Sequence, residues 1–114
     1  MTADRDQDAL LDMLIAARRA TRLAQGLTQT EFDHNEAVNV AVTHFVQIIG
    51  EAARKVSMER RESIKEIPWP QIVGMRHRVV HDYFNVKLPI VWNVLSNELP
   101  PLISILEGLL QPED

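Results

Sequence analysis

The nine residues from Arg76 to Phe84, RHRVVHDYF, concentrate side chains that exchange protons and bind anions. They hold two of the chain's four histidines, two arginines, an aspartate and the only tyrosine. Histidine exchanges a proton near neutral pH, and arginine offers a planar, permanently charged fork that suits a phosphate group. The segment is therefore a candidate for phosphodiester chemistry. An amphipathic helix end with its charged groups in water is the alternative interpretation.

Cleavage of RNA without a metal ion sets clear demands on such a segment. The 2′-hydroxyl attacks the neighbouring phosphorus, so the catalyst must remove one proton, deliver another to the 5′-oxygen and stabilise extra charge on the phosphate. His81 and Arg76 can divide these tasks. On a regular helix, however, His81 would lie about 140° from Arg76, whereas Tyr83 would share the face of Arg76. Either the helix ends before His81, or two chains related by a twofold axis assemble the site.

A metal site is a second interpretation of the same segment. His77 and His81 are four residues apart and would share one face of a helix, at a spacing found in zinc sites. Glu51, His44 or Asp82 could supply a third ligand, but no H-E-x-x-H or comparable pattern selects one of them. The histidine pair alone is weak support, so we expect no metal and no cofactor.

The charge of the chain is uneven. The formal net charge of −4 argues against broad, non-specific attraction to nucleic acid. Residues 54–81, however, carry seven lysines and arginines against three glutamates. This basic segment favours a localised anion site, although a solvated charged face is the commoner reason for such a run.

Composition also bears on the compartment. The chain has no cysteine, which excludes disulfides and thiolate metal sites and is compatible with a reducing compartment. Its start, MTADRDQDAL, is acidic and lacks the pattern of a signal peptide, and no apolar run approaches the length of a membrane span. We therefore expect a cytoplasmic protein that makes no use of a membrane.

Apolar residues recur with helical spacing in five segments, and no segment shows the two-residue period of a strand. The segments cover residues 10–27, 38–56, 70–84, 90–95 and 102–110. Asp6 or Asp8 is expected to cap the first helix and Gly26 to follow its end, while Asp33 and Glu36 form the D-x-x-E pattern of a capping box for the second. We expect residues 1–114 to form one domain, a small all-α, up-and-down bundle of about five helices.

Prolines mark the boundaries in the second half of the chain. Pro70 suits the first turn of the third helix, which carries the RHRVVHDYF segment. Residues 85–89 break that helix, and Ser96 with Pro100 and Pro101 is expected to restart the chain for the last one.

The second helix is apolar on more than one face, because Val40, Ile48 and Ala52 lie off its main apolar stripe. A helix of this kind is either central in its bundle or shared with a second subunit.

The pattern R-x4-H-x-Y, formed by Arg76, His81 and Tyr83, resembles the signature of HEPN-domain ribonucleases. The closer resemblance is to the HepT-like toxins of prokaryotic toxin–antitoxin pairs. It extends to IIGEAARKVS before the motif and to PWPQIVGM, VHDYF and VWNVLSNELPPLI around it, and so covers the chain from about Phe45 to Leu110. These phrases in this order make the match more specific than the arginine and histidine alone.

The resemblance implies a helical bundle that forms a homodimer, with two motifs lining one cleft at the interface and cutting RNA without a metal. By position, Arg76 would bind or stabilise the phosphate and His81 would transfer a proton. Tyr83 would be the tyrosine to which a cognate MNT-type nucleotidyltransferase antitoxin adds AMP. The chain would then be the endoribonuclease toxin of a type VII HEPN/MNT toxin–antitoxin system.

Three further residues are auxiliary candidates whose roles stay open. Relatives often have asparagine or another small polar residue directly after the arginine, whereas this chain has His77. Glu51, in the phrase GEAA, either approaches the site from the second helix or caps a polar network in the core. Asp82 lies between His81 and Tyr83.

Two other functions compete with the ribonuclease. A non-catalytic helical dimer that serves as the binding subunit of a nucleotidyltransferase would explain the bundle and the partner, but would leave Arg76, His81 and Tyr83 unexplained. A DNA-binding regulator is disfavoured by the acidic net charge and by the lack of a basic recognition helix.

Overall fold

The computed structural model describes residues 2–82 and 84–110. In chain order its elements are α1 (Thr2–Leu23), α2 (Gln29–His34), α3 (Glu36–Arg54), α4 (Met58–Ser63), α5 (Trp69–Val73), α6 (Met75–Val79), β1 (Val80–Asp82), β2 (Asn85–Val86), α7 (Leu88–Asn93), the π-helical turn η1 (Val94–Glu98) and α8 (Leu99–Leu110). The expected all-α bundle is confirmed. It holds more than the five expected helices, and a small two-stranded sheet lies where no strand was expected.

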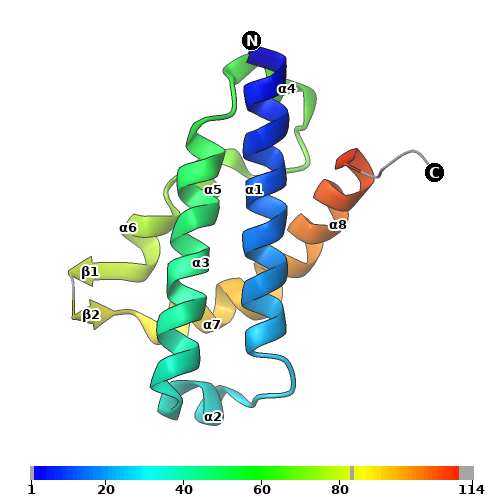
Figure 1. The fold of residues 1–114 in the computed structure, drawn as a ribbon. Coiled ribbons are helices and arrows are strands. Elements are labelled where there is room, and N and C mark those ends of the chain that lie inside the picture. The colour runs from blue at the N-terminus through cyan, green and yellow to red at the C-terminus, as the bar shows by residue number, and fades with distance from the viewer. Residues whose placement is uncertain (1, 83, 111–114) are drawn as a thin grey trace.

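The long helices α1 and α3 lie side by side and form the axis of the bundle (Figure 1). α3 also contacts α2, α5, α6 and α7, so it is central, as one interpretation of its apolar faces required. Val40 on its surface is nevertheless 59% exposed, whereas Ala52 is buried. α8 packs against α1. Across the part of the chain that the structure describes, every helix is too short or too polar to span a membrane.

The caps before α3 differ from the expected ones. The capping box belongs to α2, a short helix that the sequence did not reveal. There the Glu31 N–H donates to Thr28 Oγ1 at 3.1 Å, and the Thr28 N–H donates to Glu31 Oε1 at 2.9 Å. α3 is capped by Asn35, whose Oδ1 accepts from the Val38 N–H. The capping box expected at residues 33–36 is therefore wrong, because the chain is still helical at Asp33.

An acidic side chain is buried inside α1. Asp6 or Asp8 was expected to cap this helix, but both lie within it, so that prediction is wrong. Gly26 follows the end of the helix, as expected, with a φ of +83°. Asp6 is only 4% exposed, and its two carboxylate oxygens accept from the Ser57 N–H at 2.8 Å and the Ser57 hydroxyl at 2.7 Å. Ser57 is in turn the N-cap of α4. Asp6 thus joins the start of α1 to the start of α4, and the hydrogen bonds from the Ser57 N–H and hydroxyl lower the pKa of its carboxyl.

We expect Asp6→Asn to lower Tm by a few degrees at neutral pH and to have a smaller effect at about pH 3. The folded pKa lies below the unfolded value of about 3.9, so the carboxylate stabilises the fold above that value and stops doing so as the pH falls through the folded pKa. Thermal melts followed by circular dichroism at both pH values measure the difference. Asp8→Asn, at an exposed position of the same helix, is the control. An equal decrease of Tm by Asp6→Asn at both pH values would contradict a contribution to stability from the ionised Asp6 carboxylate.

The close approach of α3 to α5 and α6 depends on a glycine. A Cβ atom at Gly50 would lie 3.1 Å from the Ile72 carbonyl oxygen and 3.1 Å from Met75 Cβ. Met75 is fully buried and begins α6, so this contact fixes the start of the helix that carries Arg76. Pro70 stands in the first turn of α5, as expected.

α7, η1 and α8 follow one another without a break, so the expected restart at Ser96 is wrong. The Leu99 N–H donates to the Val94 carbonyl, five residues back, which is the hydrogen bond of a π-helix. Pro100 and Pro101 lack N–H groups, and their rings would crowd the carbonyls four residues earlier in a regular helix. The wider π turn relieves this crowding, so the prolines widen the helix instead of restarting it.

Candidate active site

The RHRVVHDYF segment spans the end of a helix and the start of a hairpin. α6 carries Arg76 and His77 and ends at Val79. Val80 is extended, with φ −123° and ψ 122°, and its N–H still donates to the Arg76 carbonyl. The Lys87 N–H donates to the Val79 carbonyl at 2.7 Å and closes the hairpin onto the helix end. The expectation of a continuous helix through the motif is therefore wrong, and the alternative in which the helix ends before His81 is confirmed.

His81 lies on the first strand of this hairpin. β1 pairs antiparallel with β2, and Val80 lies opposite Val86. Asp82 Oδ1 accepts from the Phe84 N–H at 3.1 Å, the side-chain-to-backbone contact of an Asx turn. Asp82 therefore helps to shape the turn. Figure 1 shows the two strands projecting from the side of the bundle, beside α3.

The two expected catalytic side chains are both at the surface. Arg76 and His81 are exposed, and neither contributes to the buried core. Arg76 Nη1 donates to Gln47 Oε1 of α3 at 3.4 Å, a long contact that leaves much of the guanidinium's capacity available. Arginine and histidine are thus presented to solvent from adjoining elements, where an extended polymer can reach them.

Gln47 was not among the residues expected at the site. It lies one helical turn before Glu51, and residues four apart share a face of a helix. This spacing from the phrase GEAA is the signal that could have identified Gln47. Glu51 is exposed, so it lies on the surface next to Gln47 and not within a polar network of the core.

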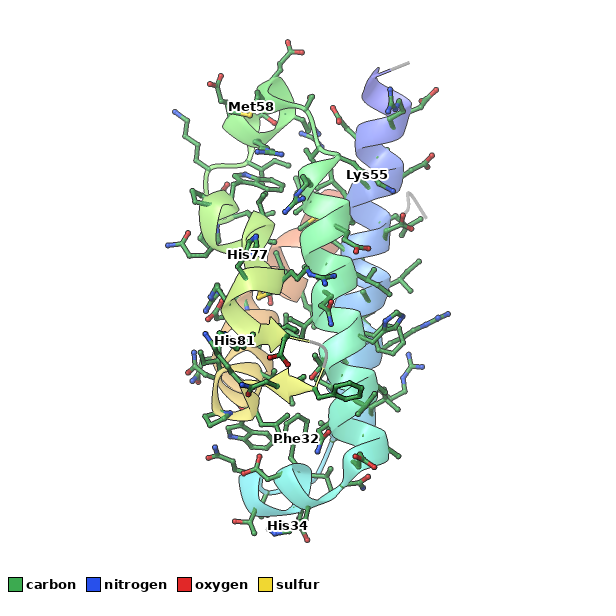
Figure 2. All side chains as sticks on the ribbon, turned by 90° about the vertical axis from the view of Figure 1, so that its left-hand side faces the viewer. Phe32, His34, Lys55, Met58, His77 and His81 are labelled. Atoms are coloured by element: carbon green, nitrogen blue, oxygen red, sulfur yellow. The ribbon has the colours of Figure 1, made fainter. Side chains whose placement is uncertain are left out.

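His77 and His81 do not share a helical face, because α6 ends between them. Both lie on the side of the molecule that faces the viewer in Figure 2, His77 on α6 and His81 below it on the hairpin. Within residues 2–82 and 84–110, no three histidine, aspartate or glutamate side chains lie close enough together to hold a metal ion. The four-residue spacing of His77 and His81 therefore does not place them together as zinc ligands. Tyr83 lies outside the described residues.

Arg61 and Arg78 of the basic segment are each bound to protein oxygens by more than one hydrogen bond. The Arg61 guanidinium donates to the carbonyls of Val56, Ala53 and Arg54, at distances of 3.0–3.3 Å, around the end of α3. Arg78 forms two hydrogen bonds with Glu98 of η1, at 2.8 and 2.5 Å. These hydrogen bonds, which the Arg78 guanidinium donates to the Glu98 carboxylate, raise the pKa of Arg78. The local positive charge available to a ligand is therefore smaller than the sequence count suggests.

Two hollows in the surface lie away from the motif. One of about 530 Å³ lies between α4 and α5 and is lined by apolar side chains that include Met58 and Trp69. Another of about 610 Å³ lies on α3 around Val40 and His44. Neither includes Arg76 or His81, so the expected catalytic residues do not belong to these hollows.

Comparison with known proteins places the chain in a family. A family model described as "Ribonuclease HepT-like" matches residues 13–109. The chain belongs to the HepT-like ribonuclease family. The matched residues include all of α3, α6 and η1 and the described strands of the hairpin. The residues that contact Arg76 and Arg78 in this HepT-like chain therefore lie within the match.

Individual relatives agree with the HepT-like assignment. A protein of Methanocaldococcus jannaschii named "Putative RNase" is 30% identical over 86% of this chain and 91% of its own length. Another "Putative RNase", from Caldanaerobacter subterraneus subsp. tengcongensis, is 33% identical over 78% of this chain and 80% of its own length. A "Probable ribonuclease HepT" of Thermococcus cleftensis is 26% identical over 90% and 94% of the two chains. No solved structure gives a significant match.

Proposed function

We propose that the chain is a metal-independent endoribonuclease and the toxin of a type VII HEPN/MNT toxin–antitoxin system. The observation that carries the proposal is the exposure of Arg76 and His81 at the junction of α6 and β1, in a member of the HepT-like ribonuclease family. An open surface suits a polymeric substrate. Arg76 offers two N–H groups toward the non-bridging oxygens of one phosphate, and His81 supplies the titratable group.

The proposed reaction is transesterification within the RNA strand. A base takes the proton of the 2′-hydroxyl, the 2′-oxygen bonds to phosphorus, and the bond from phosphorus to the 5′-oxygen breaks as that oxygen receives a proton. The products are a 2′,3′-cyclic phosphate and a 5′-hydroxyl. Arg76 stabilises the additional negative charge on the phosphate oxygens while phosphorus is bonded to both the attacking 2′-oxygen and the leaving 5′-oxygen.

The two proton transfers favour a homodimer. One His81 per chain can act as base or as acid, and two copies facing one another across a twofold axis supply both roles at once. The hairpin also presents Phe84, whose side chain is fully exposed. A large aromatic surface beside the proposed site is suited to burial against a second chain. We propose that the hairpins of two chains face each other at the cleft.

Purified protein should cleave single-stranded RNA in the presence of EDTA and leave 2′,3′-cyclic phosphate ends. The ends are identified by mass spectrometry and by their resistance to 3′ ligation until acid opens the cyclic phosphate and a phosphatase removes the resulting monophosphate. Activity that is lost in EDTA and restored by zinc or magnesium would support a metal mechanism that uses His77 and His81. No cleavage under any condition would instead support the non-catalytic binding subunit.

A further inference from the structure

Arg76 and Arg78 point to opposite sides of α6. Two residues along a helix correspond to a rotation of about 200°, and the contacts agree with this angle. Arg76 contacts Gln47 of α3, whereas Arg78 forms a bidentate pair with Glu98 of η1. The side chains of Arg78 and Glu98 are only 28% and 25% exposed. α6 is therefore tied on one side to α3 and on the other to the helix that follows the hairpin.

Glu98 is itself held in place. Asn93 Nδ2 donates to Glu98 Oε2 at 3.4 Å, and Asn97 Nδ2 donates to Asn93 Oδ1 at 2.7 Å. Glu98 is the last residue of the π turn, immediately before the leucine and the two prolines that widen the helix. π turns inside α-helices occur frequently at functional sites, because they redirect a side chain without ending the helix. Here the redirected side chain is the one that binds Arg78.

We propose that Arg78 and Glu98 are a positioning pair for the site: they fix the rotation of the last turn of α6 and thereby the placement of Arg76 and His81. This inference rests on the proposed ribonuclease function. Arg78 lies between the two site residues in the sequence, and the helix ends one residue after it. A rotation of this turn would move Arg76 and the start of β1 together, because the Val80 N–H binds the Arg76 carbonyl. Neither member of the pair is assigned a contact with RNA.

The chain contains a matched control for this pair. Arg18 of α1 and Glu107 of α8 form an ion pair at 2.7 Å, with side chains that are 48% and 42% exposed. It joins two helices of the bundle, and neither helix carries a site residue. Comparing the two pairs separates the loss of an ion pair in general from the loss of the one that holds α6.

The test compares Glu98→Gln and Arg78→Lys with Glu107→Gln and Arg18→Lys. A misplacement of about 1 Å can reduce a rate by about 10²-fold, so we expect the first two substitutions to reduce kcat for RNA cleavage by about 10-fold or more, with little change in KM. The two control substitutions should leave kcat within about twofold of the wild-type value. Exposed ion pairs contribute little to stability, and this pair holds no site residue in place. A charge swap that combines Arg78→Glu with Glu98→Arg should recover part of the lost kcat. Far-UV circular dichroism confirms that each variant is folded.

A second measurement does not depend on cleavage. The imidazole NMR resonances of His81 should shift in Glu98→Gln and stay in place in Glu107→Gln. Wild-type protein without activity would refute the ribonuclease proposal and leave this readout to decide on positioning. If the wild type is active, unchanged kcat and unchanged His81 resonances in Glu98→Gln would refute the positioning role. Equal losses of kcat from substitutions in the Arg78–Glu98 and Arg18–Glu107 pairs would refute it as well.

Discussion

Replacing Arg76 or His81 by alanine should abolish RNA cleavage without unfolding the protein. Removing a group that transfers a proton costs about 10²–10⁴-fold in rate, and removing one that stabilises the transition-state charge costs about 10²–10³-fold. Both side chains are exposed, so truncating them opens no cavity in the core. His77→Ala should have a milder effect, because no step of the reaction is assigned to it. Single-turnover cleavage of a labelled RNA measures the rates.

The same variants test toxicity and the shared site. Cells that express either alanine variant should grow normally if the wild type arrests growth, and undiminished toxicity would remove that residue from the mechanism. Because each cleavage event is proposed to use His81 of both chains, mixed dimers of the two variants, which carry a single His81, should remain inactive. Activity restored in mixed dimers would show that one His81 is enough for the reaction and would contradict the two-histidine mechanism.

The second large effect is expected at Tyr83. We propose that the cognate nucleotidyltransferase, with ATP, adds AMP to this tyrosine and silences the ribonuclease. Tyr83 is two residues after His81 in the sequence, and its neighbours Asp82 and Phe84 are exposed, so an enzyme can reach this segment. The attached nucleotide adds volume and a negative charge close to where the RNA phosphate binds. Its phosphate would also compete for the guanidinium of Arg76.

Tyr83→Phe should therefore retain cleavage and escape silencing. Co-expression with the partner should leave wild-type protein inactive and heavier by one adenylate, while the variant stays active at its unmodified mass. Peptide mass spectrometry locates the adenylate. Modification only at other residues, or a Tyr83→Phe protein that the partner still silences by modification, would contradict this mechanism.

The helical character of the bundle could be predicted because it depends on local patterns. Apolar spacing located the long helices, and Pro70 marked the start of α5. The end of α6 could not be predicted in this way. It depends on the hydrogen bond between the Lys87 N–H and the Val79 carbonyl, which forms only when the chain folds back as a hairpin. For the same reason the buried role of Asp6 was missed, because its partner lies 51 residues away.

The motif residues could be predicted from the sequence, whereas the contacts that hold them could not. The residue types in the motif predicted Arg76 and His81 as catalytic residues, and the structure places both at the surface. The contacts that hold them were not predictable from the motif. Gln47 belongs to another helix, and Glu98 reaches Arg78 only from a π turn that the prolines after it impose.

The anchoring of Arg61 and Arg78 bears on how RNA would bind at different ionic strengths. Each phosphate that a protein cation neutralises releases condensed counterions, so the number of cations that reach the strand determines how steeply affinity falls with salt. Of the seven lysines and arginines in residues 54–81, these two are each held by at least two hydrogen bonds to protein oxygens, so the segment offers fewer cations to RNA than the sequence count suggests. With a net charge of −4, general attraction should be weak and its salt dependence shallow. Selection among RNAs would then depend on contacts around Arg76 and His81.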